Sequence, residues 1–191
     1  MKPHRINANF WLISGLIILT VGSRVIPHAY NFTPIGAVAL FGAAYFKDKR
    51  WSFFLPLLIM WLSDLYLNNY VYTAYKSSPE FEWWGMTSVY IALLLSVVLG
   101  VVVFRSKVSI IRVGLASVSA SVLFFLITNC TSWYGNPMYT QDFAGLMTSY
   151  AAGLPFFYKT LIGDLVYSAI LFGVYNWVVS SVPKLQHEQS R

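Results

Sequence analysis

Six long apolar stretches follow one another along the chain, separated by short segments rich in polar residues. The stretches cover residues 10–26, 34–46, 51–67, 86–104, 110–128 and 155–182. A helix that crosses a bilayer needs about 20 mostly apolar residues, within a range of roughly 17–25. The second stretch is shorter, so it has to use its flanks, cross a thinned bilayer or end inside protein. The pattern predicts an all-α integral membrane protein in which residues 1–191 form a single domain, a bundle of six transmembrane helices.

The composition argues against a water-soluble domain. Hydrophobic residues make up 57% of the chain and charged residues 10%, and the mean hydropathy is +0.59. Soluble domains have about 25% charged residues. So few charges cannot cover this much apolar surface in water, so we expect the bilayer to be the solvent.

Basic residues cluster in the connections that an even number of spans brings to one side of the membrane. With the N-terminus inside, the cytoplasmic side has Lys2, Arg5, Lys47, Lys49, Arg50, Arg105, Lys107, Arg112, Lys184 and Arg191, and the outer side has Arg24, Lys76 and Lys159. Cytoplasmic loops are enriched in Lys and Arg. This predicts a multi-pass protein of the cell inner membrane with both termini in the cytoplasm. The basic residues form no stripe with interleaved aromatic residues, so nucleic acid is not an expected partner.

The first stretch has a second interpretation. Lys2 and Arg5 precede an apolar run that ends in Val21-Gly22-Ser23, a pattern that a cleaved signal peptide shares. The apolar character continues through Val25 and Ile26, which is longer than the usual signal-peptide core and favours a retained helix.

The polar and aromatic residues of chemical interest fall on the outer side of this topology. A small-ligand pocket needs aromatic walls and a few convergent polar groups. The candidate substrate-binding residues are Arg24, His28, Asn31, Asp64, Trp83, Trp84, Asn129, Trp133, Tyr134, Lys159 and Asp164. The alternative for the aromatic residues is an interfacial belt, since Trp and Tyr favour both membrane surfaces.

Two helix starts on the outer side could attract an anionic or carbonyl group. Thr33 is the expected N-cap and Pro34 the first residue of the second helix, and Gly153-Leu154-Pro155 is expected to open the sixth helix. Free N–H groups and the positive end of the dipole favour anions there. The alternative is that these are simply good helix starts.

Two carboxylates fall within the predicted spans. Asp164 shares one helix face with Thr160 and Tyr167, and Asp64 lies near the outer end of the third span. Charged groups inside a membrane usually face the bundle interior and mark function. They could contact ligand or couple transport to protons. The alternative is a buried structural pair, for example Asp164 with Arg24 or Asp64 with Lys159.

Small residues crowd the second stretch, where Ala39 and Ala43 have the spacing that lets helices approach closely. The partner is either a neighbouring helix of this chain, which we favour, or another subunit. No nucleotide-binding, hydrolase or metal-binding motif occurs in the sequence. We therefore expect no enzyme activity, no metal and no cofactor, and any ATP would be bound by another chain.

Residues 24–46, Arg-Val-Ile-Pro-His-Ala-Tyr-Asn-Phe-Thr-Pro-Ile-Gly-Ala-Val-Ala-Leu-Phe-Gly-Ala-Ala-Tyr-Phe, resemble an uncharacterised bacterial family of small putative transport proteins. So do Ser63-Asp64-Leu65, Ile127-Thr128-Asn129 and residues 153–165, Gly-Leu-Pro-Phe-Phe-Tyr-Lys-Thr-Leu-Ile-Gly-Asp-Leu. That family in turn is similar in size and topology to the S components of energy-coupling-factor (ECF) vitamin transporters.

The resemblance implies a six-helix protein with both termini inside that binds a vitamin or related nutrient near the outer face. It also implies a coupling subunit, which would dock on the small-residue face, and ATPases. A solitary relative of the S components carries cobalamin and uses a cysteine as the cobalt ligand, which would give Cys130 that role here.

Three functions follow as hypotheses. The first is a membrane transport protein that captures a small, vitamin-like nutrient and carries it inward, as the substrate-binding subunit of an ECF-type transporter. The second is a stand-alone proton- or ion-coupled carrier with Asp164 and Asp64 as the titrating pair. The third is a membrane scaffold or enzyme, for which the sequence offers neither a nucleophile–base pair nor a metal site.

Overall fold

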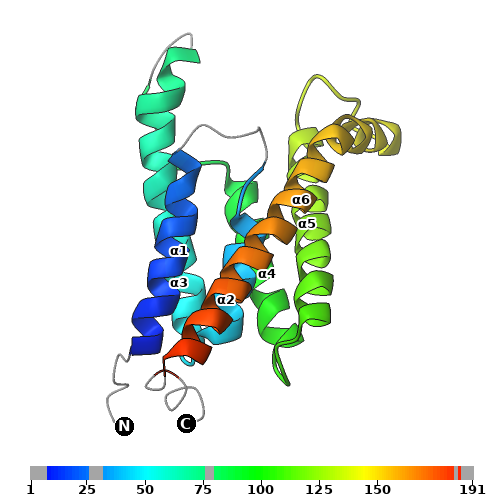
Figure 1. The fold of residues 1–191 in the computed structure, drawn as a ribbon. Coiled ribbons are helices and arrows are strands. Elements are labelled where there is room, and N and C mark those ends of the chain that lie inside the picture. The colour runs from blue at the N-terminus through cyan, green and yellow to red at the C-terminus, as the bar shows by residue number, and fades with distance from the viewer. Residues whose placement is uncertain (1–7, 26–31, 76–79, 183–184, 186–191) are drawn as a thin grey trace.

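A computed structural model describes residues 8–25, 32–75, 80–182 and 185. Its α-helices are α1 (Ala8–Gly22), α2 (Ile35–Tyr45), α3 (Lys49–Tyr66), α4 (Thr87–Val103), α5 (Ile110–Trp133) and α6 (Phe143–Ser181), shown in Figure 1. Three short helical segments join them, namely η1 (Ser23–Val25), the π-helical η2 (Leu67–Val71) and η3 (Tyr72–Tyr75). The described part of the chain contains no β-strand, which confirms the all-α prediction.

Five of the six helices begin within two residues of the predicted apolar stretches, although α1 ends four residues earlier and α5 five residues later than predicted. The sixth prediction is wrong at its start, because α6 begins at Phe143 and has Pro155 in its interior. Asp142 is the N-cap, and its carboxylate accepts the backbone N–H of Gly145 at 2.8 Å. An interior proline loses one backbone hydrogen bond and kinks a helix. Figure 1 accordingly shows the yellow first part of α6 turned away from its orange remainder.

Within the described ranges, two helices, α5 and α6, are long and apolar enough to cross a membrane, while α1, α2 and α4 are shorter apolar helices. The outward surface of α5 and α6 is itself apolar. Ile111 and Leu115 of α5 are 75% and 63% exposed, and Ile170 of α6 is 51% exposed. Continuous apolar surface of this kind marks contact with a membrane or another protein.

Helix α2 lies at the centre of the bundle and packs against all five other α-helices. Every residue from Ile35 to Ala43 is buried. A Cβ at Gly100 of α4 would lie 2.7 Å from the Cβ of Ala43, so the absent side chain lets the two helices touch. This confirms that the small residues face neighbours in the same chain. The expectation that another subunit docks on them is wrong, because the face is already covered.

The first residues of α1 and the last residues of α6 lie at the same end of the bundle (Figure 1). There, the Asn9 side chain donates to the carbonyl of Leu185 at 3.2 Å, and the Tyr175 hydroxyl donates to Asn9 at 3.4 Å. We call this the terminal end. The α2–α3 and α4–α5 connections also lie there, and together with the first turns of α3 and α5 they contain Lys47, Lys49, Arg50, Arg105, Lys107 and Arg112. The opposite end, where α1, α3 and α5 finish, is called the distal end.

Candidate functional site

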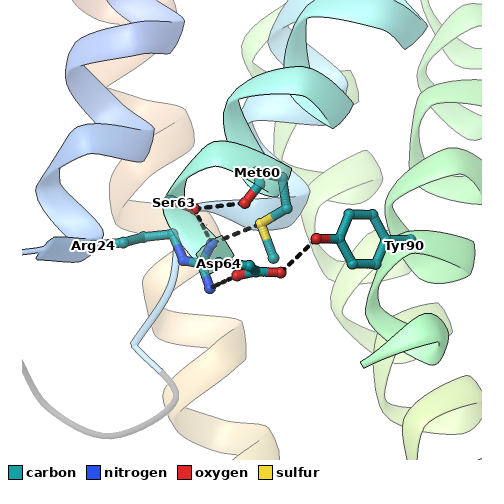
Figure 2. Close-up of polar contacts among 5 residues, drawn as sticks. All are labelled: Arg24, Met60, Ser63, Asp64 and Tyr90. Carbon is teal, nitrogen blue, oxygen red and sulfur yellow. Dashed lines mark hydrogen bonds and ion pairs between the residues drawn. The ribbon is translucent and has the colours of Figure 1, made fainter. Parts of the chain in front are cut away.

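A buried ion pair joins three segments toward the distal end (Figure 2). Arg24 belongs to η1, Asp64 to α3 and Tyr90 to α4. The Arg24 Nη2 lies 3.0 Å from Asp64 Oδ1, and the Tyr90 hydroxyl donates to Asp64 Oδ2 at 2.7 Å. The side chains of Arg24 and Asp64 are only 13% and 9% exposed. Both carboxylate oxygens therefore have a partner inside the bundle.

The Nη1 atom of Arg24 also has partners. Its Nη1 donates to Ser63 Oγ at 2.5 Å and approaches Met60 Sδ at 2.8 Å (Figure 2). The Ser63 hydroxyl in turn donates a hydrogen bond to the carbonyl of Met60 at 2.8 Å. One turn of α3 thus surrounds the arginine with acceptors. We call Arg24, Met60, Ser63, Asp64 and Tyr90 the Arg24 cluster.

The segment before α4 covers the Asp64 carboxylate. Gly85 passes so close that a Cβ there would collide with Asp64 Oδ2. The segment is held on α3 by the Trp61 indole, which donates to the carbonyl of Trp83 at 2.9 Å. Trp83 and Trp84, both candidate ligand contacts, are 63% and 68% exposed beside this cover. The structure therefore brings Arg24, Asp64 and the two tryptophans into one region.

Asp164 has a separate set of partners. Ser121 of α5 donates to its Oδ2 at 2.7 Å, and the backbone N–H of Ala37 donates to its Oδ1 at 3.2 Å. Gly36 leaves room for the carboxylate, which is 2% exposed. The anion expected at the start of α2 is therefore a residue of this same chain. The predicted N-cap Thr33 is wrong by one position, since Pro34 is the N-cap and has no side-chain cap bond.

The two structural pairings suggested by the sequence are wrong. Arg24 pairs with Asp64 rather than with Asp164, and the Lys159 amine lies 6.0 Å from the ring centre of its neighbour Tyr158. Asp64 and Asp164 bind different partners and so belong to two separate networks. The separation arises because α2 starts against α6, whereas η1 ends against α3.

Asn129, Trp133 and Tyr134 belong to a third network, which builds the α5–α6 connection. The carbonyl of Asn129 accepts from Ser149 at 2.9 Å, and the Trp133 indole donates to the carbonyl of Thr140 at 2.8 Å. Tyr134 is 79% exposed. These contacts fold the connection onto the end of α5 and involve no residue of the Arg24 cluster.

Asp142 completes this connection. Hydrogen bonds from the Gly145 backbone and from the Thr140 hydroxyl hold the pKa of Asp142 below its usual range. A carboxylate favours a helix N-terminus, where free N–H groups converge. The network thus explains why α6 starts a full three turns earlier than its proline suggested.

Several residues of these networks were absent from the predicted site, among them four that touch one of the two carboxylates or border it closely. They are Gly36, Gly85, Tyr90 and Ser121. Tyr90 and Ser121 were visible as polar groups within otherwise apolar stretches, and a polar group in a span needs an internal partner. The sequence did not show that the two glycines lie against carboxylates, because such close approach depends on how the helices pack.

Two candidate residues, His28 and Asn31, lie outside the described residues. Cys130 is half-buried near the end of α5. Within the described ranges, no group of three or more His, Cys, Asp or Glu residues could hold a metal ion. A cobalt-binding role for Cys130 stays a prediction that the structure does not test.

A small cavity of about 10 Å³ adjoins Arg24 and Met60, and its other walls include Pro34, Ile35 and Leu93. This is room for about one water-sized sphere, whereas small-molecule sites measure roughly 300–1,000 Å³. A ligand at the Arg24 cluster therefore requires the helices around it to separate.

Of the two expected resemblances, the comparisons with known proteins support the one to an uncharacterised family. No curated protein and no solved structure matched the chain. The likeness to ECF S components thus stays a prediction. A family model does match nearly the whole chain, over residues 4–185. The chain therefore belongs to this family of unknown function, DUF6580.

Proposed function

We propose that this chain is a multi-pass protein of the cell inner membrane, with six spans and both termini in the cytoplasm. The distribution of charge supports this orientation, because the basic connections gather at the terminal end. Exposed tryptophans at both ends add support. Trp11 and Trp177, 66% and 69% exposed, lie toward the terminal end, and Trp83 and Trp84 belong to the distal end. Exposed aliphatic residues occupy the helices between, as in a lipid-facing band.

Within this topology, we propose that the chain is a transport protein that binds a small, vitamin-like nutrient near the outer face and carries it inward. The Arg24 cluster is the observation that supports this most directly. A charge inside a bilayer costs at least about 2.5–3.5 kcal/mol and usually marks a substrate or ion pathway. Here a buried cation and anion lie toward the outer end, beside two exposed tryptophans.

The transported nutrient would need an energy source that this chain does not encode. In an ECF-type transporter, a coupling subunit and ATPases supply it, and the chain would be their substrate-binding subunit. The coupling subunit would then have to contact an exposed surface rather than α2, all of whose residues from Ile35 to Ala43 are buried.

A stand-alone ion-coupled carrier is the second candidate. Asp164 favours it, since this carboxylate is 2% exposed and its described partners, Ser121 and Ala37, are uncharged donors. Uptake by the chain alone in liposomes, driven by a pH gradient, is the expected result for such a carrier. Uptake only after addition of an ATPase module would reject it in favour of the first proposal.

Ligand binding is the experiment that tests the main proposal. The detergent-purified chain is screened by native mass spectrometry for co-purified molecules and by thermal shift against a vitamin panel. Arg24→Gln and Asp64→Asn should weaken binding of any hit at least about tenfold. Arg50→Gln, at the exposed terminal end, is the matched control and should bind like the parent. Unchanged binding in both cluster variants would remove the Arg24 cluster from the site.

A further inference from the structure

The Arg24 cluster has no net charge while Arg24 and Asp64 are paired. This neutrality restricts which ligands can separate the pair. Arg24 and Asp64 compensate each other at 3.0 Å, and both are largely buried. Removing one partner of a buried ion pair leaves an uncompensated charge, which is far more costly than keeping or replacing both. The neighbouring cavity is too small to admit a ligand beside the intact pair.

A ligand with a single charge cannot separate the pair without leaving one buried charge uncompensated. An anion that binds Arg24 leaves Asp64 unpaired, and a cation that binds Asp64 leaves Arg24 unpaired. An uncharged ligand that separates the two leaves both unpaired. A ligand with one positive and one negative group can replace each residue's partner at the same time.

We propose that the Arg24 cluster recognises a small zwitterion of the amino-acid class, a conclusion that rests on the proposed function. The ligand carboxylate takes the position of Asp64 on Arg24, and the ligand ammonium takes the position of Arg24 on Asp64. Binding therefore exchanges one ion pair for two and leaves no buried charge alone.

The hydrogen-bonding groups of the cluster fit this exchange. Once Asp64 is displaced, the Arg24 Nη2 offers a charge-assisted donor to a ligand carboxylate, while Ser63 and Met60 keep the guanidinium in place through Nη1. An ammonium has three N–H donors. Asp64 offers both carboxylate oxygens, and the Tyr90 hydroxyl, which donates to Oδ2, still has a lone pair to accept a further hydrogen.

The cover over Asp64 supplies the apolar surroundings that a ligand body needs. Trp83 and Trp84 immediately precede Gly85 in sequence, and Gly85 lies against the carboxylate. The Trp61 ring stands 6.0 Å from that of Trp84. Aromatic faces also attract an ammonium group. The charged centre and the aromatic surface are therefore neighbours.

The test uses the full chain in detergent and the twenty standard amino acids as probes, with thermal shift as the measurement. The amino acid that stabilises most is then compared with its decarboxylated amine and its deaminated acid. The zwitterion should bind at least about tenfold more tightly than either analogue, as expected for a lost charge-assisted contact. Equal binding of an analogue, or no binding of any amino acid, overturns the inference.

Variants of the pair provide a second readout. Arg24→Gln should reverse the preference toward the amine, and Asp64→Asn should reverse it toward the acid. If either variant misfolds, the exchanged double variant Arg24→Asp/Asp64→Arg keeps the pair and should regain the preference for the zwitterion. Tyr90→Phe keeps both charges and should weaken the zwitterion but not the acid. An unchanged order of affinities in these variants also overturns the inference.

The outcomes separate this inference from the function on which it rests. Binding of a vitamin without any amino acid would overturn the zwitterion and leave the transport proposal standing. Binding of neither panel would reject both.

Discussion

The carboxylate of Asp164 caps the first turn of α2 across the bundle, with its Oδ1 3.2 Å from the backbone nitrogen of Ala37. The helix has no side-chain cap of its own, because its N-cap is Pro34. A residue far away in the sequence therefore supplies the acceptor that Ser, Thr, Asp or Asn usually provides locally. This contact fixes where α2 sits relative to α6.

Gly36→Ala should destabilise the protein. A Cβ at this position would lie 2.6 Å from Asp164 Oδ2, and hydrogen bonds from Ser121 and Ala37 hold the buried carboxylate, so it cannot move aside cheaply. Overpacking of this kind costs about 1–3 kcal/mol. Thermal unfolding in detergent measures the loss. Gly173→Ala, where nothing lies within 4 Å, is the control and should melt no lower than the parent, since alanine favours a helix more than glycine does.

Asp164→Ala and Asp164→Asn should differ in stability. Alanine leaves the Ala37 N–H without an acceptor and opens a cavity, which should cost about 2–4 kcal/mol. Asparagine keeps the volume and one acceptor oxygen, so its cost should be smaller by at least about 1 kcal/mol. Denaturant unfolding of both variants gives the comparison. Equal losses would show that the cap bond contributes nothing.

Arg24 and Asp64 should show strong coupling in a double-mutant cycle. Each single change, Arg24→Gln or Asp64→Asn, leaves one buried charge alone and should cost about 3–5 kcal/mol. The double variant has no lone charge, so its loss should be well below the sum of the two singles. Unfolding free energies of the four proteins provide the test, and additive losses would contradict the buried pair.

Gly153→Ala should disturb the bend of α6, because a Cβ at Gly153 would collide with the Asn129 side chain. Asn129→Ala removes the obstructing group. The cost of Gly153→Ala should therefore be smaller in the Asn129→Ala background, by about 1 kcal/mol or more. Thermal unfolding of the single and double variants decides this. The same cost in both backgrounds would mean that Asn129 and Gly153 do not press on each other.

The helices could be located from the sequence because each is a long run of apolar residues, a signal that depends on local composition alone. The start of α6 could not, since Pro155 is a common first residue of helices, whereas here it lies within one. Asp142 and Gly145 identify the true start, and their significance emerges only once the α5–α6 connection is folded.

The candidate site was predictable in part. Arg24 and Asp64 were chosen as candidates because a charged residue in or beside an apolar stretch usually has an internal partner or a functional role. The structure brings the two together. Their partnership was not predictable, since pairing depends on how η1 meets α3 and α4. Asp164 was correctly expected to be buried with polar contacts, but its partners are the Ser121 hydroxyl and the Ala37 backbone N–H, a group that every residue except proline has.

The orientation of the chain in the membrane is the claim on which both proposals depend, and cysteine labelling tests it most directly. In a Cys130→Ser background, Met138→Cys in the α5–α6 connection and Lys107→Cys in the α4–α5 connection give one exposed thiol each. A membrane-impermeant maleimide applied to intact spheroplasts should label Met138→Cys at once and Lys107→Cys only after lysis. Labelling of Lys107→Cys from outside, with Met138→Cys protected, would put the Arg24 cluster toward the cytoplasm and contradict the account.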